Sequence, residues 1–355
     1  MNSQQTSSDI TVKFMYRGIY NEESRMGWIR QFPGNEPVWG RCRFSFDPDL
    51  RSYDWLVVYH DLPANRGEGT GPTVETLACH RKNTLHVTHE PSSITTYGHA
   101  YQAQYGHVLT SQEPSCVRHP NRIYTHPGFP WYYGRSFSGK PFLSYDQIAS
   151  AQPKAKTKLL STVCSAKQQK HTVHQQRYDF TQKIKAAIPE LEIFGHGVQP
   201  IDEKAETLDD YKYHLAIENH FSPHHWTEKL SDPFLGHCLP IYAGAPNASQ
   251  YVPEDSFVSI NLQDVDSAIK TIQKLLKEDP YEQRLPTILE ARKRMLEEHN
   301  LFSILSRNIE QLHQPLPPSG DTILCRKAFW KIHPLARIQC VIEKSFRVLS
   351  GRFSI

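Results

Sequence analysis

The sequence predicts an α/β protein built on parallel sheets. Short apolar runs that end in polar residues recur along its 355 residues, and such runs are typical of central strands in a parallel sheet. The clearest pattern lies in residues 211–246, where a strand, a polar loop, a helix start, a second strand and a glycine turn follow one another. These parts are the run 213–217, the pair Glu218-Asn219, the segment Thr227-Glu228-Lys229-Leu230, the run 239–242, and Gly244 with Pro246. This layout indicates a nucleotide-binding half, in which ligands lie beyond the carboxyl ends of the strands.

Further strands and helices are predicted on both sides of this stretch. Before it, the pattern predicts strands over 10–19, 42–46, 55–59, 85–88 and 108–110, and a helix near 74–80. Closer to it, we predict a strand over 159–165, a helix over 168–187 and a strand over 191–194. After it, we predict helices over 268–278, 288–299 and 302–313, with Pro280 and Pro286 as breaks.

The bulk properties favour a cytoplasmic enzyme. A net charge of +3 is too small to indicate nucleic acid as a partner. The seven cysteines show no CxxC pair and are typical of free thiols in a reducing compartment. The first ten residues are polar and no apolar run of about 18 residues occurs, so we expect neither a signal anchor nor a membrane span.

The motifs in residues 216–264 resemble the signature of the α1,3/4-fucosyltransferases, glycosyltransferase family 10. The matching segments are Ala216-Ile217-Glu218-Asn219, Thr227-Glu228-Lys229-Leu230, Pro240 to Pro246, Tyr251-Val252-Pro253, Ser256-Phe257-Val258 and Asp264. The resemblance implies a bacterial-type member with the GT-B architecture, in which two Rossmann-like domains face each other across a cleft. It also implies inverting transfer of L-fucose from GDP-β-L-fucose to a glycan hydroxyl, without a metal or another cofactor.

The resemblance also implies the site residues. Glu90, at the end of the strand 85–88 and before Pro91, corresponds to the family's catalytic base, although it could merely cap a loop. Arg177 corresponds to the arginine that contacts the donor diphosphate, with Lys170 and Lys183 as competing positions. The donor site is completed by Glu218, Asn219, His225, Thr227, Glu228 and Lys229. His225 stands at the position, two residues before the threonine, at which the family often has tyrosine.

Three domains are expected: an acceptor-binding domain over 1–150, a donor-binding domain over 151–314, and a Pro-rich break with a basic amphipathic tail over 315–355. The tail suits an anionic membrane surface with a lipid-linked acceptor, or packing on the domain or on a second subunit. The aromatic segment 119–139 suits either an acceptor groove or a packed loop.

Other functions stay open at this stage. One alternative is an inverting GT-B enzyme that uses a different nucleotide sugar on a bacterial surface glycan such as lipopolysaccharide. A more distant one is a non-catalytic sugar-binding protein. The 19 histidines form no recognised metal motif, so no metal ligands are expected.

Overall fold

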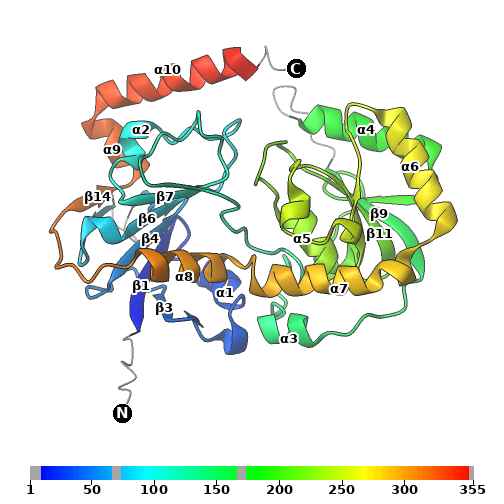
Figure 1. Ribbon diagram of the computed structural model, residues 1–355, viewed down its shortest axis with the longest axis horizontal. Coiled ribbons are helices and arrows are strands. Elements are labelled where there is room, and N and C mark those ends of the chain that lie inside the picture. The colour runs from blue at the N-terminus through cyan, green and yellow to red at the C-terminus, as the bar shows by residue number, and fades with distance from the viewer. Residues whose placement is uncertain (1–8, 66–72, 166–172, 352–355) are drawn as a thin grey trace. The chain divides into compact units, whose positions relative to one another are not determined.

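The computed structural model describes residues 9–65, 73–165 and 173–351, and the chain forms two compact units. The first unit comprises Met1–Pro127 and Leu301–Ile355, and the second comprises Gly128–Asn300. Each unit contains one large sheet and its own hydrophobic core (Figure 1).

The sheet of the first unit has the strand order β2-β3-β1-β4-β6-β7-β8. All neighbours pair in parallel except β2, which pairs antiparallel with β3 at one edge. The strands are β1 (Ile10–Tyr16), β2 (Val38–Trp39), β3 (Cys42–Ser45), β4 (Trp55–Tyr59), β6 (Thr84–Val87), β7 (His107–Thr110) and β8 (Arg122–Tyr124). Every residue of β4 and β6 is buried, as the continuous apolar run over 55–59 predicts.

The sheet of the second unit is parallel throughout, with the order β10-β9-β11-β12-β13. Its strands are β9 (Lys158–Val163), β10 (Leu191–Phe194), β11 (Tyr211–Ile217), β12 (Leu239–Ala243) and β13 (Val258–Ser259). The chain moves from β9 to β10 on one side and then to β11 on the other. The strand order therefore reverses between β9 and β11, which is where doubly wound sheets bind ligands.

Helices connect the strands and extend the two units. In the first unit these are α1 (Glu22–Ile29), α2 (His99–Gln102), α8 (Leu301–Leu312), α9 (Arg326–Ile332) and α10 (Pro334–Gly351). In the second unit these are α3 (Tyr145–Ser150), α4 (His174–Ala187), α5 (Glu228–Leu235), α6 (Val265–Glu278) and α7 (Tyr281–Glu297). A small antiparallel sheet in the first unit pairs β5 (Val74–Thr76) with β14 (Thr322–Leu324).

The expected domain boundaries at 150 and 314 are displaced in the structure. Trp131, Tyr133 and Ile148 are buried in the core of the second unit, so residues 128–150 belong there. Within the aromatic segment 119–139, Trp131 and Tyr133 are therefore packed in a core. After α7 the chain returns to the first unit, where Phe302 packs its ring 5.4 Å from that of Phe14 and 4.0 Å from that of Phe32.

The segment 315–355 is likewise more than an appended tail. Ile323, Cys325 and Phe329 are buried in the core of the first unit. The largely exposed surface that the amphipathic pattern predicts is found over residues 334–345 of α10, shown in red in Figure 1. The boundary predictions were wrong because composition does not show which core an apolar residue joins.

Most strand predictions are confirmed, whereas the prediction of a helix near 74–80 was wrong. Residues 74–76 form β5, whose register with β14 places Thr76 opposite Thr322, a pairing partner nearly 250 residues away that local patterns do not reveal. Pro286 lies inside α7 and does not end it, so the prediction of a break at this residue was wrong. The part of the predicted helix 168–187 before residue 173 lies outside the described residues.

Candidate active site

The candidate donor site lies where the strand order of the second sheet reverses. Glu218 and Asn219 follow the last residue of β11, and Arg177 lies in the first turn of α4, on the connection that leaves β9. The Arg177 guanidinium donates a hydrogen bond to the Asn219 side-chain oxygen. The structure therefore brings together a helix residue and a strand-end residue that are 42 positions apart in the sequence.

The carboxylate of Glu218 organises the start of α5. It is 1% exposed and accepts hydrogen bonds from the Thr227 backbone N–H at 2.7 Å and from the Thr227 hydroxyl at 2.9 and 3.0 Å. The Thr227 hydroxyl in turn caps α5 by accepting from the Lys229 backbone N–H at 3.3 Å. Burial raises the pKa of Glu218. The strand end is thereby tied to the helix N-terminus that follows the loop.

Positively and negatively charged side chains alternate around the N-terminus of α5. The Lys229 ammonium lies 2.9 Å from Glu228 Oε1 and 3.9 Å from Glu218 Oε2. The Lys204 ammonium lies 2.9 Å from Asp232 Oδ2 and 3.3 Å from the Glu228 carbonyl oxygen. This arrangement holds Glu228 and Lys229 in place through ion pairs that are largely shielded from water.

These neighbours set the protonation states. Burial raises the pKa of Glu228, but the Lys229 and Lys204 charges outweigh it and hold that pKa well below its usual range. Burial lowers the pKa of Lys229, but Glu228 and Glu218 outweigh it and raise that pKa above its usual value. Glu228 is therefore an anion and Lys229 a cation at neutral pH, which suits them to ribose hydroxyls and to a diphosphate respectively.

The two candidate diphosphate-binding cations are near each other. The charge of Arg177 acts on Lys229 and lowers its pKa, against the larger effect of the two carboxylates. The Arg177 Nε–H is buried and has no hydrogen-bond partner among the described residues. A guanidinium with an unused donor beside an ammonium is an arrangement that can bind an anion.

The His225 side chain is also enclosed by protein. It is 3% exposed, and its ring lies 5.5 Å from that of Phe129 and 5.3 Å from that of His220. These edge-to-face contacts make it part of the packing beneath the loop that leads to Thr227.

Gly244 and Tyr242 lie next to Glu218, and the sequence analysis predicted no role for them beyond their motif. A Cβ atom on Gly244 would lie 2.1 Å from the Tyr242 hydroxyl oxygen and 2.6 Å from Glu218 Cγ. The Tyr242 hydroxyl accepts a hydrogen bond from the Ala245 backbone N–H at 2.9 Å. Only glycine therefore allows the turn after β12 to approach Glu218 so closely.

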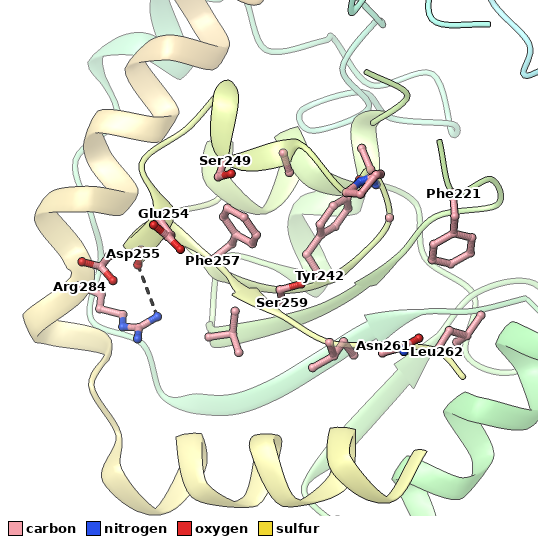
Figure 2. Close-up of a pocket in the computed structure, with 16 residues that line it drawn as sticks. Phe221, Tyr242, Ser249, Glu254, Asp255, Phe257, Ser259, Asn261, Leu262 and Arg284 are labelled. Atoms are coloured by element: carbon pink, nitrogen blue, oxygen red, sulfur yellow. Dashed lines mark hydrogen bonds between the residues drawn. The ribbon is translucent and has the colours of Figure 1, made fainter. Parts of the chain in front are cut away.

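A hollow of about 700 Å³ opens beside this turn, at the carboxyl ends of β12 and β13. Figure 2 shows Phe221 at one end, Tyr242 and Ser259 in the middle, and Glu254, Asp255 and Arg284 at the other end. The dashed line marks the hydrogen bond of 3.5 Å from Arg284 to the Asp255 carbonyl oxygen. Glu218 lies behind Tyr242 and Gly244 and is not part of the lining.

Glu90 lies in the first unit, three residues beyond the end of β6. Strand β6 lies between β4 and β7 in the sheet. Its side chain is 37% exposed, and Oε1 lies 3.7 Å from His89 Nε2. The Glu90 carbonyl oxygen accepts a hydrogen bond from the Gln112 side chain at 2.8 Å. Glu90 therefore has a constrained backbone and an accessible carboxylate, as a general base requires.

Several polar residues that surround Glu90 were not anticipated. Tyr97 is 1% exposed and accepts a hydrogen bond from the His89 backbone N–H at 3.0 Å. His60, which follows β4, has a φ of 67° and lies with Nδ1 2.7 Å from the Tyr97 hydroxyl. Arg17 and Asp61 form an ion pair of 3.2 Å at the ends of β1 and β4. The signal that could have found Arg17, His60 and Asp61 is their shared position after parallel strands.

Two further properties bear on binding. Within residues 9–65, 73–165 and 173–351, no group of three or more His, Cys, Asp or Glu side chains could hold a metal ion. Over the same residues, no helix has both the length and the apolar character needed to cross a membrane.

Comparison with known proteins finds sequence similarity within the second unit. Residues 153–285 match the family model described as glycosyltransferase family 10 (fucosyltransferase), C-terminal region. An α-(1,3)-fucosyltransferase FucT from Helicobacter pylori is 34% identical over 76 residues, which are 21% of this chain and 16% of that protein. A fucosyltransferase-like protein from Arabidopsis thaliana is 34% identical over 75 residues, which are 21% of this chain and 15% of that protein. The matched stretches thus span about a sixth of these relatives.

The fold likeness extends beyond this region. A crystal structure of an α1,3-fucosyltransferase superposes with a TM-score of 0.51, covering 90% of this chain and 94% of that one at 14% identity. At this identity the likeness concerns the fold. The expected GT-B fold, with a Rossmann-like sheet in each of two units, is confirmed.

Proposed function

Because residues 153–285 carry the region of glycosyltransferase family 10, as the sequence motifs indicated, we propose that the chain is an inverting fucosyltransferase. It transfers L-fucose from GDP-β-L-fucose to a hydroxyl group of a glycan and gives an α-L-fucoside. The observation that carries this proposal is the meeting of Arg177, Asn219 and Lys229 where the second sheet reverses its strand order. The names of the matched relatives support fucose as the transferred sugar.

The second unit binds the donor. Arg177 and Lys229 contact the diphosphate, and their two positive charges stabilise the negative charge that develops on GDP as the bond to fucose breaks. In this proposal the two cations supply the charge that a metal ion supplies elsewhere. Glu228 accepts hydrogen bonds from the ribose hydroxyls, while Glu218 and Thr227 hold the helix start in position.

Glu90 of the first unit acts as the general base. Its carboxylate takes the proton of the acceptor hydroxyl as that oxygen attacks the anomeric carbon and the bond to GDP breaks. The attack comes from the face opposite to the leaving group, so the configuration inverts. This step needs an accessible carboxylate on a fixed backbone, and Glu90 has both properties.

Nucleotide selectivity tests the donor assignment. Thermal unfolding and calorimetry are measured with GDP, UDP, CDP and ADP, first without added metal and then with EDTA. The proposal expects stabilisation by GDP that exceeds that by the other nucleotides and survives EDTA. Preference for UDP, CDP or ADP would refute the donor, and loss of binding in EDTA would refute the metal-independent site.

We also propose that α10 lies on an anionic membrane surface, where a lipid-linked acceptor would be found. One side of α10 packs against the rest of the first unit. Cys340 Sγ lies 3.8 Å from the Thr96 carbonyl oxygen, and Glu343 lies 3.7 Å from His99. Large apolar side chains remain on the surface, with exposed fractions of 48–80%: Ile332, Leu335, Ile338, Val341 and Ile342. The spacing of 335, 338 and 342 places three of them on one stripe.

Charge favours lipid over a second copy of the chain as the occupant of this stripe. Lys331, Arg337 and Lys344 are exposed in the same segment, and its single acidic residue, Glu343, faces His99. Two copies meeting through the stripe would bring like charges together, whereas anionic lipid complements them. The protein is expected to sediment with phosphatidylglycerol vesicles and not with phosphatidylcholine vesicles, and Ile338→Glu is expected to abolish this. Equal binding to both vesicles, or a dimer in sedimentation that Ile338→Glu dissociates, would contradict the proposal.

A further inference from the structure

The turn that presents Glu90 is held on one side by a buried hydroxyl group, that of Tyr97. The Tyr97 oxygen accepts a hydrogen bond from the backbone N–H of His89, the residue before Glu90, at 3.0 Å. On the other side of the peptide, the Gln112 side chain donates to the carbonyl oxygens of Glu90, at 2.8 Å, and Thr95, at 2.9 Å. Both ends of the turn that presents the Glu90 carboxylate are thereby fixed.

The hydrogen-bond balance of Tyr97 is complete. A tyrosine hydroxyl has one proton, and backbone N–H groups only donate, so the proton of Tyr97 is directed to His60 Nδ1 at 2.7 Å. Burial, followed by the charge of Arg17, lowers the pKa of His60 to about 3, so the ring is neutral and can accept that proton. His60 adopts a left-handed backbone conformation, which is uncommon for a residue with a side chain and is often found at functional sites.

The C-terminal segment holds the Tyr97 ring. Arg326, the first residue of α9, places its guanidinium 5.2 Å from the centre of the Tyr97 ring and donates to the Thr96 carbonyl oxygen at 3.3 Å. Its backbone N–H donates to Asp61 Oδ1 at 3.0 Å. Next to Tyr97, a Cβ atom on Gly98 would lie 2.7 Å from the Trp330 ring and 3.0 Å from Cys340 Sγ. The loop 91–98 is thus packed directly against α9 and α10.

We propose that Tyr97 is a positioning residue for Glu90 and that Arg326 holds Tyr97 in place for this role. The inference rests on the proposed function, because it assumes that Glu90 is the base. Without the hydroxyl, the backbone N–H of His89 loses its acceptor, and the neighbouring Glu90 carboxylate is free to move away from the attacking oxygen. A displacement of about 1 Å can reduce a rate about 100-fold.

Hydrolysis of GDP-β-L-fucose by water tests this without a known acceptor, because the attacking water must also lose a proton to the base. The variants are Tyr97→Phe, Glu90→Gln and, as a matched control, Tyr105→Phe. Tyr105 is also fully buried, and its hydroxyl contacts that of Tyr101 and not the Glu90 turn. The readouts are kcat and KM over a range of pH, the Kd for GDP and the Tm.

Tyr97→Phe is expected to lower kcat about 10- to 100-fold relative to Tyr105→Phe, with unchanged Kd for GDP and an altered acid limb of the pH profile. A kcat within twofold of the control would overturn the inference. If Tyr97→Phe does not fold, Arg326→Met is used to test the inference. A fall in kcat at constant Kd for GDP, partly restored in Arg326→Lys, supports the inference. An unchanged kcat overturns it. Full activity of Glu90→Gln, or no hydrolysis by the wild-type protein, would instead refute the proposed function.

Discussion

Replacing Lys229 by methionine is expected to weaken GDP binding by about 10- to 100-fold. Methionine keeps most of the apolar stem and removes the charge that lies 2.9 Å from Glu228 and 3.9 Å from Glu218. A hydrogen bond from a charged group contributes about 1.5–3 kcal/mol. Since each 1.4 kcal/mol corresponds to about tenfold in Kd, the loss of one such contact with the diphosphate gives the stated range.

The same substitution also destabilises the fold. Breaking a buried ion pair costs about 3–5 kcal/mol, but the Lys229 and Glu228 side chains are about a fifth exposed, so about 1–3 kcal/mol is expected. Lys212→Met is a matched control, because the Lys212 side chain is 21% exposed against 20% for Lys229 and is paired with Asp279 away from the site.

The assay is calorimetric titration with GDP in EDTA, together with urea unfolding of both variants. Lys212→Met is expected to bind GDP like the wild-type protein. If folded Lys229→Met binds GDP within twofold of the wild-type Kd, the assignment of Lys229 to the diphosphate is wrong.

Three more outcomes are expected. Gly244→Ala places a methyl group 2.1 Å from the Tyr242 hydroxyl oxygen and is expected to lower both the Tm and the affinity for GDP. A wild-type Kd for GDP in calorimetry would contradict this expectation. Phe302→Ala removes a ring that packs against those of Phe14 and Phe32, so urea unfolding should show a loss of about 3–5 kcal/mol, and a loss below about 1 kcal/mol would refute its central place in the core. Because the fold lowers the pKa of Glu228, this carboxylate stabilises the protein above the unfolded-state pKa of about 4.3, and the stabilisation disappears as the pH falls through and below that value. The Tm difference between the wild-type protein and Glu228→Gln should therefore shrink on acidification, and a difference that stays constant from pH 7 to pH 3.5 would contradict this.

The sequence was sufficient for the elements whose signals are local. The strand 55–59 could be recognised because all five of its residues are apolar and buried. The start of α5 could be recognised because Thr227 caps it through its own neighbouring N–H group. The order of elements around Glu218 then predicts that several candidate donor residues lie at one edge of a sheet.

Features that depend on contacts between distant residues could not be predicted in this way. Lys204 carries no motif, yet it neutralises Asp232 and supports Glu228 from another loop. Tyr97 is one of 17 tyrosines, and nothing in the neighbouring sequence shows that its hydroxyl binds the backbone N–H of His89, next to Glu90. The domain boundary was misplaced for the same reason, since Phe302 lies in a helix that looks continuous with the preceding domain.

The return of the chain to the first unit at Leu301 has a consequence for biosynthesis. The strands of the first sheet leave the ribosome early, but Phe302, Ile323 and Phe329, which help to bury its core, are made only after the whole second unit. At a translation rate of about 5–20 residues per second, roughly 10 to 35 seconds pass between the synthesis of the first sheet and the synthesis of these residues. The contiguous second unit has no such delay. We therefore expect the second unit to fold first during translation, and the first unit to depend on chaperones until its last helices have been synthesised.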